Sequence, residues 1–483
     1  MHTTIYAICE SPKNPLLIWA GTDDGNLQVT RNGGKTWTNV TSNLTTAGVP
    51  KNAWVSSIDA GHFDEGTAYA TFDTHMFGDM RPYAYKTIDY GKTWTSVIPK
   101  DAKVRGYAHV VKEDLVNRDL LFAGTEFGLW VSVDGGKQWA QYKGGDFPSV
   151  AVRDLAIHPR DADLVIATHG RGIWIIDDIT PLRKLTADTL AKEAEFIQGN
   201  PVVQRIPAGG GWVDGDAEFT GPNPPDSAVI TFYQKKRHIF GDMKLEVFDA
   251  QGNLVSTIPS SKRRGLNRVL WSMRMKAPRV PTAASAAFGA QVGPRILPGA
   301  YTVKLTKDKN VYTMPLQVVG DPRANYPARD RKAQFDLMMK LYHALEDMTF
   351  ATDRINGVRT ALEDRASKLP PNDPLANRLR NAAKQVDELR RRIVATKEGG
   401  AITGEQRLRE YLTELYGNVS GYEGRPSQTQ TDRSDAIAHE LGDVVKDFDA
   451  WTARELGGIN SALRQKGLEP IAVLTRAGWD KKE

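Results

Sequence analysis

A short pattern that recurs three times limits what the first part of this chain can fold into. The pattern is Ser/Thr-x-Asp/Asn-x-Gly-x-x-Trp, and its copies occupy residues 30–37, 87–94 and 132–139. In such a segment the Asp or Asn oxygen accepts backbone N–H bonds, the glycine adopts a positive φ, and the tryptophan packs back onto a sheet. The pattern therefore predicts the same tight turn three times. Its structural residues are Asn32, Gly34, Trp37, Asp89, Gly91, Trp94, Asp134, Gly136 and Trp139.

A strand pattern precedes each of these turns and recurs a fourth time. Its marker residues are Ala20, Ala70, Ala123 and Ala167, which lie 50, 53 and 44 positions apart (20 to 70, 70 to 123, 123 to 167). A period of this length suits a four-stranded propeller blade of roughly 40–50 residues. Residues 1–185 are therefore predicted to form four blade-sized β-units.

These turns and strands resemble the Asp-box (BNR) repeats of sialidases, xyloglucanases and sortilin-like β-propellers. The segments WAGTDDGN (19–26), FAGTEFG (122–128) and ATHGRGIWIIDDITPL (167–182) are similar to bacterial sortilin-like proteins that are often described as glycosyl hydrolases. The resemblance covers residues 1 to about 185 closely and the remainder more weakly. It implies an Asp-box propeller in which the box is a structural turn rather than a catalytic site. It also implies a secreted or periplasmic location.

The number of blades is small for a closed ring. Propellers typically need roughly 4–8 blades, the sortilin-like ones are larger, and this sequence supplies at most four. We therefore expect the chain to be the C-terminal portion of a longer protein, or one half of a propeller that is completed by self-association or by a second chain.

The composition excludes several functional classes. The 63 Lys and Arg residues against 58 Asp and Glu residues give a net charge of +5, which is small for 483 residues, so nucleic acid is not an expected partner. Cys9 is the only cysteine, which excludes an intrachain disulfide and a Cys-based metal site. No run approaches the roughly 18 apolar residues of a membrane span. No cofactor and no metal are expected, because zincin, serine-hydrolase, P-loop and EF-hand motifs are absent.

The residue patterns after position 185 predict a β-sandwich followed by helices. Residues 186–225 are predicted to be a linker and the start of a sandwich, with Gly/Pro-rich stretches such as Ala208–Trp212. Alternating strand-like runs over 226–320 predict an Ig-like β-sandwich. From 329 to 483 the apolar period becomes 3.6, which indicates an antiparallel helical bundle. The overall prediction is thus a multidomain chain, mainly β and then α. The helical stripes either bury against each other or present a surface for a partner.

Candidate functional residues follow the marker strands, at equivalent places in the blades. Such positions open on one face of a propeller, where they could form a polar arc that binds sugar hydroxyls or a cation. The competing interpretation is that they only build turns, since Asp-Gly and Gly-x-Gly are ordinary turn signals. The catalytic candidates are Asp23, Asp24 and Glu126, and the ligand-binding candidates are His169 and Arg171 together with Asp73, His75, Asp79 and Arg81 of one long loop.

Two functions from different classes are compatible with this sequence. The favoured one is a non-catalytic, extracytoplasmic binding or scaffold protein that recognises a protein or glycan with its propeller face. The alternative is a glycoside hydrolase of the xyloglucanase or sialidase type, with its active site on the same face. Glycoside hydrolysis needs two carboxyl groups roughly 5–9.5 Å apart, and the sequence does not assign such a pair.

Overall fold

A computed structural model describes residues 3–197, 199–206, 221, 223–285, 288–324, 326–399 and 404–481. The chain divides into two compact units. Unit 1 comprises residues 1–199, 231–237 and 263–267, and unit 2 comprises residues 200–230, 238–262 and 268–483. The Gly-rich stretch Ala208–Trp212 of the predicted linker lies outside the described residues.

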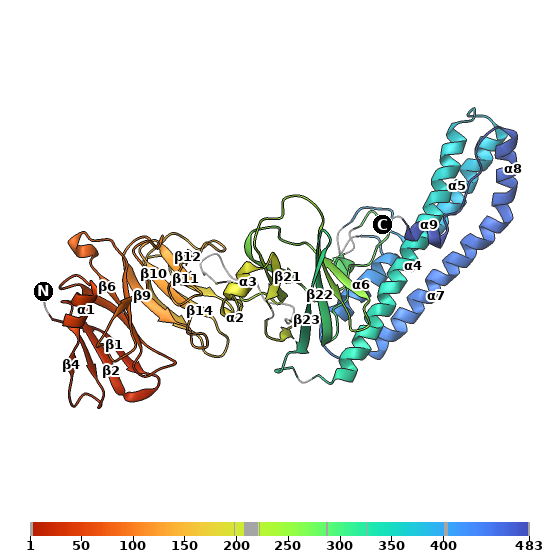
Figure 1. The fold of residues 1–483 in the computed structure, drawn as a ribbon. Coiled ribbons are helices and arrows are strands. Elements are labelled where there is room, and N and C mark those ends of the chain that lie inside the picture. The colour runs from red at the N-terminus through yellow and green to blue at the C-terminus, as the bar shows by residue number, and fades with distance from the viewer. Residues whose placement is uncertain are drawn as a thin grey trace. The chain divides into compact units, whose positions relative to one another are not determined.

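Unit 1 begins with four consecutive antiparallel sheets, each of which follows the order of its strands along the chain. Figure 1 shows them from red to orange. The first sheet contains β1 (Ile5–Ser11), β2 (Asn14–Thr22), β3 (Leu27–Thr30) and β4 (Thr38–Asn39). The second contains β5 (Trp54–Ala60), β6 (Ala68–Asp73), β7 (Tyr83–Thr87) and β8 (Thr95–Ser96). The third contains β9 (Ala108–Glu113), β10 (Leu121–Thr125), β11 (Gly128–Ser132) and β12 (Ala140–Gln141). The fourth contains β13 (Val152–Ile157), β14 (Leu164–Thr168) and β15 (Ile173–Ile176).

The sheets are arranged like neighbouring blades of a propeller. Their first strands follow one another, because β1 contacts β5, β5 contacts β9 and β9 contacts β13. Apolar side chains fill the space between successive sheets. Trp19 of the first sheet packs edge-on against Trp94 of the second, and Tyr69 of the second shares a core with Leu121 of the third. The propeller-like arrangement of four blade-sized units is therefore seen directly in the packing.

The three predicted turns share one hydrogen-bond pattern. In the second turn, Asp89 Oδ1 accepts the Thr93 N–H at 2.9 Å, and the Thr87 hydroxyl accepts the Gly91 N–H at 2.9 Å. The same pattern joins Asn32 to the Thr36 N–H and Asp134 to the Gln138 N–H. The glycines at the fifth position of the motif, Gly34, Gly91 and Gly136, all have a positive φ, as the motif requires.

The turn tryptophans differ in burial because they pack against the preceding blade. Trp94 is 7% exposed, and Trp139 donates its indole N–H to the Val97 carbonyl of the second blade at 2.8 Å. Trp37 belongs to the first blade and is 42% exposed. The same motif therefore contributes to the core only where another blade lies beside it.

Three short helices and a second group of strands follow or interrupt the blades. The helices are α1 (Thr41–Ala47), α2 (Thr180–Arg183) and α3 (Ala187–Ala191), and η1 (His75–Phe77) is a 3-10 turn after β6. Arg183 of α2 forms three hydrogen bonds to the buried Asp114 carboxylate and so ties this helix to the third blade. A three-stranded sheet has the order β16 (Ala194–Ile197), β18 (Ala228–Gln234) and β21 (Gly265–Trp271).

Unit 2 contains a five-stranded sheet and the long helices. The sheet has the order β17-β23-β22-β19-β20, in which β17 and β23 are parallel and the other pairs are antiparallel. Its strands are β17 (Val202–Gln204), β19 (Met243–Phe248), β20 (Leu254–Ile258), β22 (Gly299–Lys307) and β23 (Asn310–Gly320), and η2 (Phe288–Ala290) is a 3-10 turn. Six strands, β18 to β23, lie where the alternating pattern predicts them. The backbone of η2 lies so close to α6 (Leu408–Ser420) that a Cβ on Gly289 would stand 1.9 Å from the Thr413 carbonyl oxygen, so only glycine fits there.

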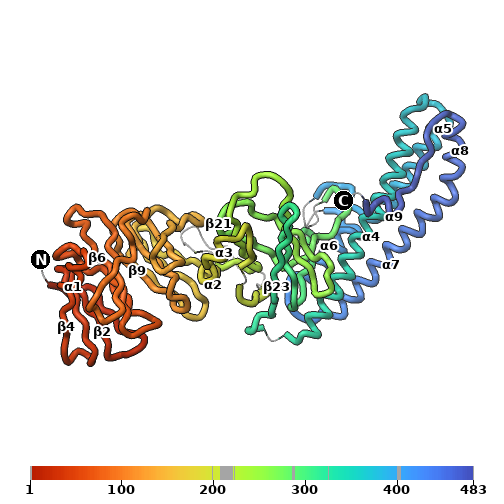
Figure 2. The backbone as a smooth tube through the Cα atoms, in the orientation of Figure 1, coloured from red at the N-terminus to blue at the C-terminus, as the bar shows by residue number. Residues whose placement is uncertain are grey.

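The helices of unit 2, which Figure 2 traces in green to blue, bury one continuous apolar core. Asp373 caps α5 by accepting the Leu375 N–H, and Pro374 occupies its first turn, as expected at a helix start. A π-helical turn, Thr452–Leu456, joins α7 to α8. The helices are α4 (Ala328–Ser367), α5 (Pro374–Ile393), α6 (Leu408–Ser420), α7 (Gln428–Trp451), α8 (Gly457–Gln465) and α9 (Arg476–Asp480).

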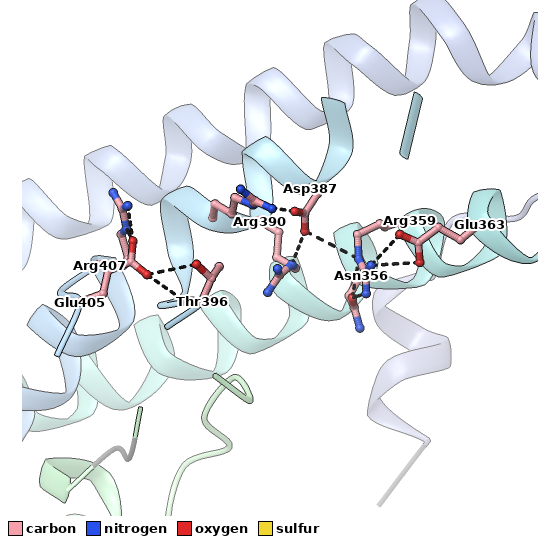
Figure 3. Close-up of polar contacts among 9 residues, drawn as sticks. Asn356, Arg359, Glu363, Asp387, Arg390, Thr396, Glu405 and Arg407 are labelled. Atoms are coloured by element: carbon pink, nitrogen blue, oxygen red, sulfur yellow. Dashed lines mark hydrogen bonds and ion pairs between the residues drawn. The ribbon is translucent and has the colours of Figure 1, made fainter. Parts of the chain in front are cut away.

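Charged side chains connect the solvent faces of these helices. Asp387 on α5 accepts a hydrogen bond from Arg390 at 2.8 Å and lies 3.8 Å from Arg359 of α4, which also binds Glu363 (Figure 3). Glu405 accepts the Thr396 N–H at 2.8 Å and pairs with Arg407. Exposed pairs of this kind each contribute little to stability, so the apolar core of unit 2 dominates its packing. No helix of the described chain is long and apolar enough to cross a membrane.

We predict that the turn tryptophans have unequal effects on stability. Trp94→Ala should lower the free energy of unfolding by about 3–5 kcal/mol, because it leaves a cavity between two blades. Trp37→Ala should cost about 1 kcal/mol or less, because its ring is already partly solvated. Calorimetric melting of both variants tests this prediction. The melting of the helices in unit 2 serves as the internal reference, because neither substitution touches them. Equal shifts for the two variants would contradict the inter-blade role of Trp94.

Candidate functional site: a groove along the inner strands

The first strands of the four blades line a groove of about 870 Å³ within unit 1. These strands follow one another in space, so a residue at the same position in each strand contributes to the same surface. The loop after β6 adds His75 and Met76, and the loop after β14 adds His169. The strand residues at the groove include Tyr6 and Ile8 of β1, Trp54 and Ser56 of β5, His109 of β9, and Arg153 and Asp154 of β13.

A register shift at the same place in every inner strand directs one side chain into this groove. The pairing of β1 with β2 skips Tyr6, and the pairing of β5 with β6 skips Ser56. The pairing of β9 with β10 skips His109, and that of β13 with β14 skips Arg153. A β-bulge leaves the extra residue outside the ladder and re-aims its side chain. Four successive bulges thus place a tyrosine, a serine, a histidine and an arginine along one groove.

Asp73, at the end of β6, is the centre of the polar contacts at the groove. Its side chain is fully buried, and Oδ1 lies 2.6 Å from His75 Nδ1 and accepts the His75 backbone N–H at 3.0 Å. Oδ2 lies 3.2 Å from His109 Nδ1. Burial by itself would raise the pKa of Asp73, but the hydrogen bonds from His109 and His75 outweigh it, so this pKa lies below its usual value. The Asp73 carboxylate is therefore ionised and holds the side chains of His75 and His109 in place.

The Nδ1 atom of His109 faces two groups that require opposite hydrogen-bonding roles from it. Arg153 Nη1 lies 3.1 Å from the same Nδ1 atom that faces Asp73. An arginine N–H can only donate and a carboxylate can only accept. His109 Nδ1 can donate to Asp73 or accept from Arg153, but one nitrogen cannot do both at once. Arg153 also donates to the Tyr107 hydroxyl at 3.1 Å.

Aromatic rings surround these polar groups. The His75 ring stacks on Tyr107 with centroids 4.5 Å apart, and the Arg153 guanidinium also lies over the Tyr107 ring, 5.6 Å from its centroid. Trp54 packs edge-on against both His109 and Tyr6. Burial raises the pKa of Tyr107, and the nearby Arg153 only partly offsets this effect. The Tyr107 hydroxyl is thus neutral, and it holds the Arg153 side chain in place by accepting a hydrogen bond from it.

Asp23 and Asp24 hold their own turn and the N-terminal segment. Asp23 Oδ1 accepts the Thr4 N–H at 2.9 Å. Asp24 accepts hydrogen bonds from the hydroxyls of Thr22 and Thr3 and from the Asn26 amide. These bonds, that from Thr22 first, lower the pKa of Asp24. Neither residue is part of the groove lining.

The long loop after β6 separates its four candidate residues into two pairs. His75 lines the groove, and the buried Asp73, which is not part of the lining, contacts His75 and His109. Asp79 and Arg81 instead form an ion pair at 2.6 Å, with Arg81 largely exposed, and Asp79 also accepts the Tyr83 hydroxyl. This second pair lies outside the groove lining.

The remaining candidates follow β10 and β14. His169 lines the groove and its backbone N–H bonds the Ala151 carbonyl. Arg171 is exposed, and its carbonyl accepts the Trp174 indole N–H. Glu126 lies behind Tyr107, to whose carbonyl its backbone N–H donates, and its buried Oε2 has no hydrogen-bond partner among the described residues.

Sequence reasoning missed most of the inner-strand residues. Trp54, Tyr107, His109 and Arg153 belong to no sequence motif. The signal that unites them is positional, because Tyr6, Ser56, His109 and Arg153 occupy the bulge of each repeat. The described residues contain no group of three His, Cys, Asp or Glu side chains that could hold a metal ion.

Comparisons with known proteins give little further information. No protein-family model matches the chain, and no curated protein sequence matches it significantly. Among solved structures it is similar to YCF48 from Cyanidioschyzon merolae, with a TM-score of 0.28 and 18% identity over 36% of this chain and 56% of that chain. A structure of YCF48 bound to D1 peptide gives a TM-score of 0.26 and 17% identity over 37% of this chain and 64% of that chain. The chain thus spans little more than half the length of the first of these structures.

We predict that Asp73 stabilises unit 1 in a pH-dependent way. Asp73→Asn should lower the free energy of unfolding by roughly 1–3 kcal/mol near pH 7, because a neutral amide replaces a buried carboxylate with several donors. The folded pKa of Asp73 is below the unfolded value of about 3.9. Its contribution is therefore complete above that value and is lost as the pH falls through the folded pKa. Urea unfolding at several pH values should show the wild-type advantage shrinking below about pH 4.

Asp64→Asn is the matched control for this experiment. Asp64 is an exposed aspartate whose only described ion pair, with Arg118, is also exposed. Its replacement should change the free energy of unfolding by about 0.5 kcal/mol or less at every pH. A wild-type advantage over Asp73→Asn that stays constant or grows on acidification would contradict the assigned role of Asp73.

Proposed function

We propose that this is a non-catalytic, extracytoplasmic binding or scaffold protein that recognises a segment of a protein or glycan along the groove of unit 1. The observation that carries the proposal is the set of four bulges, which turn one side chain from each blade into the same groove. An extended ligand that lies across the inner strands would meet all four. The chemistry of the lining is suited to binding, since tyrosine, tryptophan and arginine dominate the binding energy of many interfaces.

The arrangement of carboxylates supports a binding function rather than hydrolysis. Asp154 is the one carboxylate among the described residues at the groove lining. Asp73 lies beneath the groove, and both of its oxygens face histidines. A glycosidase needs a general acid and a second carboxylate across a cleft, and the described groove offers no such pair of free carboxylates.

Finer features of the architecture belong to the same proposal. We infer that the three turns mark an Asp-box propeller of the BNR or sortilin-like kind, that residues 226–320 form an Ig-like sandwich, and that residues 329–483 form a helical bundle. Residues 1–185 would then recognise the ligand, while the other parts act as spacer and as a surface for association. A secreted or periplasmic location follows from the same resemblance.

The alternative proposal is a glycoside hydrolase of the xyloglucanase or sialidase type. One observation favours it, namely that Glu126 Oε2 is buried beside Tyr107 without a hydrogen-bond partner among the described residues. A buried carboxyl group of this kind suits a general acid. Asp23 and Asp24 give the alternative less support, because their oxygens are engaged in a turn.

We predict that Arg153→Ala weakens ligand binding at least about tenfold, because Arg153 is a groove arginine without a carboxylate partner among the described residues. The ligand is first selected by panning the full chain against a random peptide library and a glycan array. Its affinity for each variant is then measured by calorimetry. Arg81→Ala is the matched control, since Arg81 lies outside the groove lining, and it should bind as the wild type does.

Other results would contradict the binding proposal. Equal affinities of the two arginine variants would remove the groove as the binding site. Hydrolysis of aryl-glycosides or xyloglucan that Glu126→Gln abolishes and Glu65→Gln spares would favour the hydrolase instead. Failure of every library and array ligand would contradict both the protein and the glycan form of the proposal.

The outer faces of the first and fourth blades support a second chain as partner. Ile8 pairs with Ala20 as Val111 pairs with Ala123, yet Ile8 is 70% exposed and Val111 is fully buried. On the fourth blade Ile173 is 73% exposed. These faces correspond to the two sides of the interface that the inner blades repeat, so a second copy of the chain could cover both of them. Self-association that extends the ring is therefore part of the proposed function.

We predict that the protein dimerises through these faces. Sedimentation at increasing concentration should show a dimer that Ile173→Lys disrupts, because a lysine cannot be buried against a second blade without a partner. Val116→Lys, at an equally exposed position in a loop, should leave the dimer intact. A monomer at every concentration, or equal effects of the two variants, would contradict the second-copy proposal.

A further inference from the structure

Three arginines of unit 2 lie close together without an acidic partner. Arg274 follows β21, Arg295 precedes β22, and Arg331 lies near the start of α4. Among the described residues, none of the three forms an ion pair with a carboxylate. Other arginines of this unit do, as where Arg323 pairs with Asp321 at 2.6 Å. The three arginines are therefore an exception that the packing of the helices does not explain.

The backbone places Arg274 and Arg295 directly opposite each other. They form an isolated antiparallel bridge, and the N–H groups of the residues that follow them, Met275 and Ile296, donate across it at 2.9 and 3.0 Å. Because these bonds lie on either side of the two arginines, the arginines are a non-hydrogen-bonded pair. In such a pair the Cα atoms approach to about 4.5 Å and the side chains lie closest. Two like charges at these positions repel each other.

Arg331 reaches the same segment from the helix. Its Nη2 atom donates to the Ile296 carbonyl, next to Arg295, at 3.2 Å. Arg274 Nη1 donates to the Gly293 carbonyl, on the other side of Arg295, at 2.8 Å. The guanidinium groups of Arg274 and Arg331 therefore flank Arg295 along one short stretch of backbone.

The cluster is buried as well as crowded. Arg331 is 6% exposed, and the Nε atoms of Arg295 and Arg331 are buried without a hydrogen-bond partner among the described residues. Burial, together with repulsion by Arg295 and Arg331, lowers the pKa of Arg274 to about 10. Burial also lowers the pKa of Arg295 and of Arg331, which the more distant Glu423 and, for Arg295, Asp226 only partly offset. Buried like charges destabilise a fold unless a counter-charge approaches them.

Hydrogen bonds hold the frame of the cluster in place. Gln334 Oε1 accepts from Arg331 Nη1 at 3.0 Å, and Gln334 Nε2 donates to the Val419 carbonyl of α6 at 2.7 Å. Gln204 Nε2 donates to the Ile296 carbonyl at 3.0 Å. The arginines are thus positioned before any ligand arrives, which lowers the entropy that binding costs.

The chemistry of the cluster selects the kind of ligand. A guanidinium group is a planar fork of donors that matches the oxygens of phosphate, sulfate and carboxylate groups. Three forks around one point suit a tetrahedral anion, whose four oxygens can meet donors from several directions, better than a planar carboxylate with two. The burial of Arg331 favours a small ion over a polymer such as a nucleic acid.

We propose that Arg274, Arg295 and Arg331 form a binding site for a small tetrahedral oxyanion, either phosphate or sulfate. The bound ion supplies the counter-charge that the described residues around the cluster do not, and it stabilises unit 2. This site is independent of the groove in unit 1 and of any ligand that binds there.

Calorimetric titration of the full chain with sodium phosphate and with sodium sulfate, at constant ionic strength, tests the proposal. Both ions should bind, and malonate should bind at least about tenfold more weakly. Arg295→Gln should weaken phosphate binding at least about tenfold, because it removes a charged fork of donors. Arg274→Gln should have the same effect and serves as a second variant. Phosphate should also raise the melting temperature of the wild type, as a ligand of the folded state does, but not that of Arg295→Gln.

Arg464→Gln is the matched control for these variants. Arg464 is an exposed arginine on α8 of the same unit, so its replacement removes the same charge and should leave phosphate binding within about twofold of the wild type. Absence of phosphate and sulfate binding by the wild type would overturn the proposal. Equal losses of affinity in Arg295→Gln and Arg464→Gln would do so too, as would malonate binding at least as tight as that of phosphate.

Discussion

The burial of apolar faces between successive blades is the constraint on which unit 1 depends. A four-stranded antiparallel sheet has two faces, and a blade within the array buries both of them against its neighbours. The repeats meet this requirement with recurring apolar positions, such as Tyr69 and Leu121 in the core between the second and third blades. Polar groups then tie the blades together at the same interfaces, as where Lys112 binds Asp59 and where the Tyr69 hydroxyl bonds Glu113. Register between blades is therefore fixed by packing and by hydrogen bonds at once.

This fixed register is what makes a groove out of isolated side chains. A bulge in a single strand would only turn one residue outward. Because β1, β5, β9 and β13 stack in the same register, their four bulges fall in line and their side chains share one surface. The repeated blades thus determine the geometry of the groove, while the side chain at the bulge differs from blade to blade. A repeated scaffold with unequal side chains is a general way to build a specific site on a regular fold.

The sequence predicts the local structure of this chain better than its site. The motif with Asp89 and Trp94 predicts a turn, and the turn forms, because its hydrogen bonds lie within seven residues. The strands β18 to β23 and the helices α4, α5 and α7 follow from alternation and from the 3.6-residue period for the same reason. Burial is less local, since Trp37 and Trp94 share a motif but differ in exposure according to whether a blade precedes them. The contact of Asp73 with His109 joins residues 36 positions apart, and no spacing rule reveals it.

The contacts of His109 bear on the proposed binding role of the groove. Its Nδ1 atom faces a carboxylate that needs a donor and an arginine that needs an acceptor. In a purely structural network such a conflict would be removed by a different side chain, because a half-satisfied polar cluster costs stability. Here it persists beside the groove that all four inner strands line, and in the proposed complex an acceptor on the ligand would resolve it. Arg153 could then turn to the ligand, and His109 could donate to Asp73 without competition.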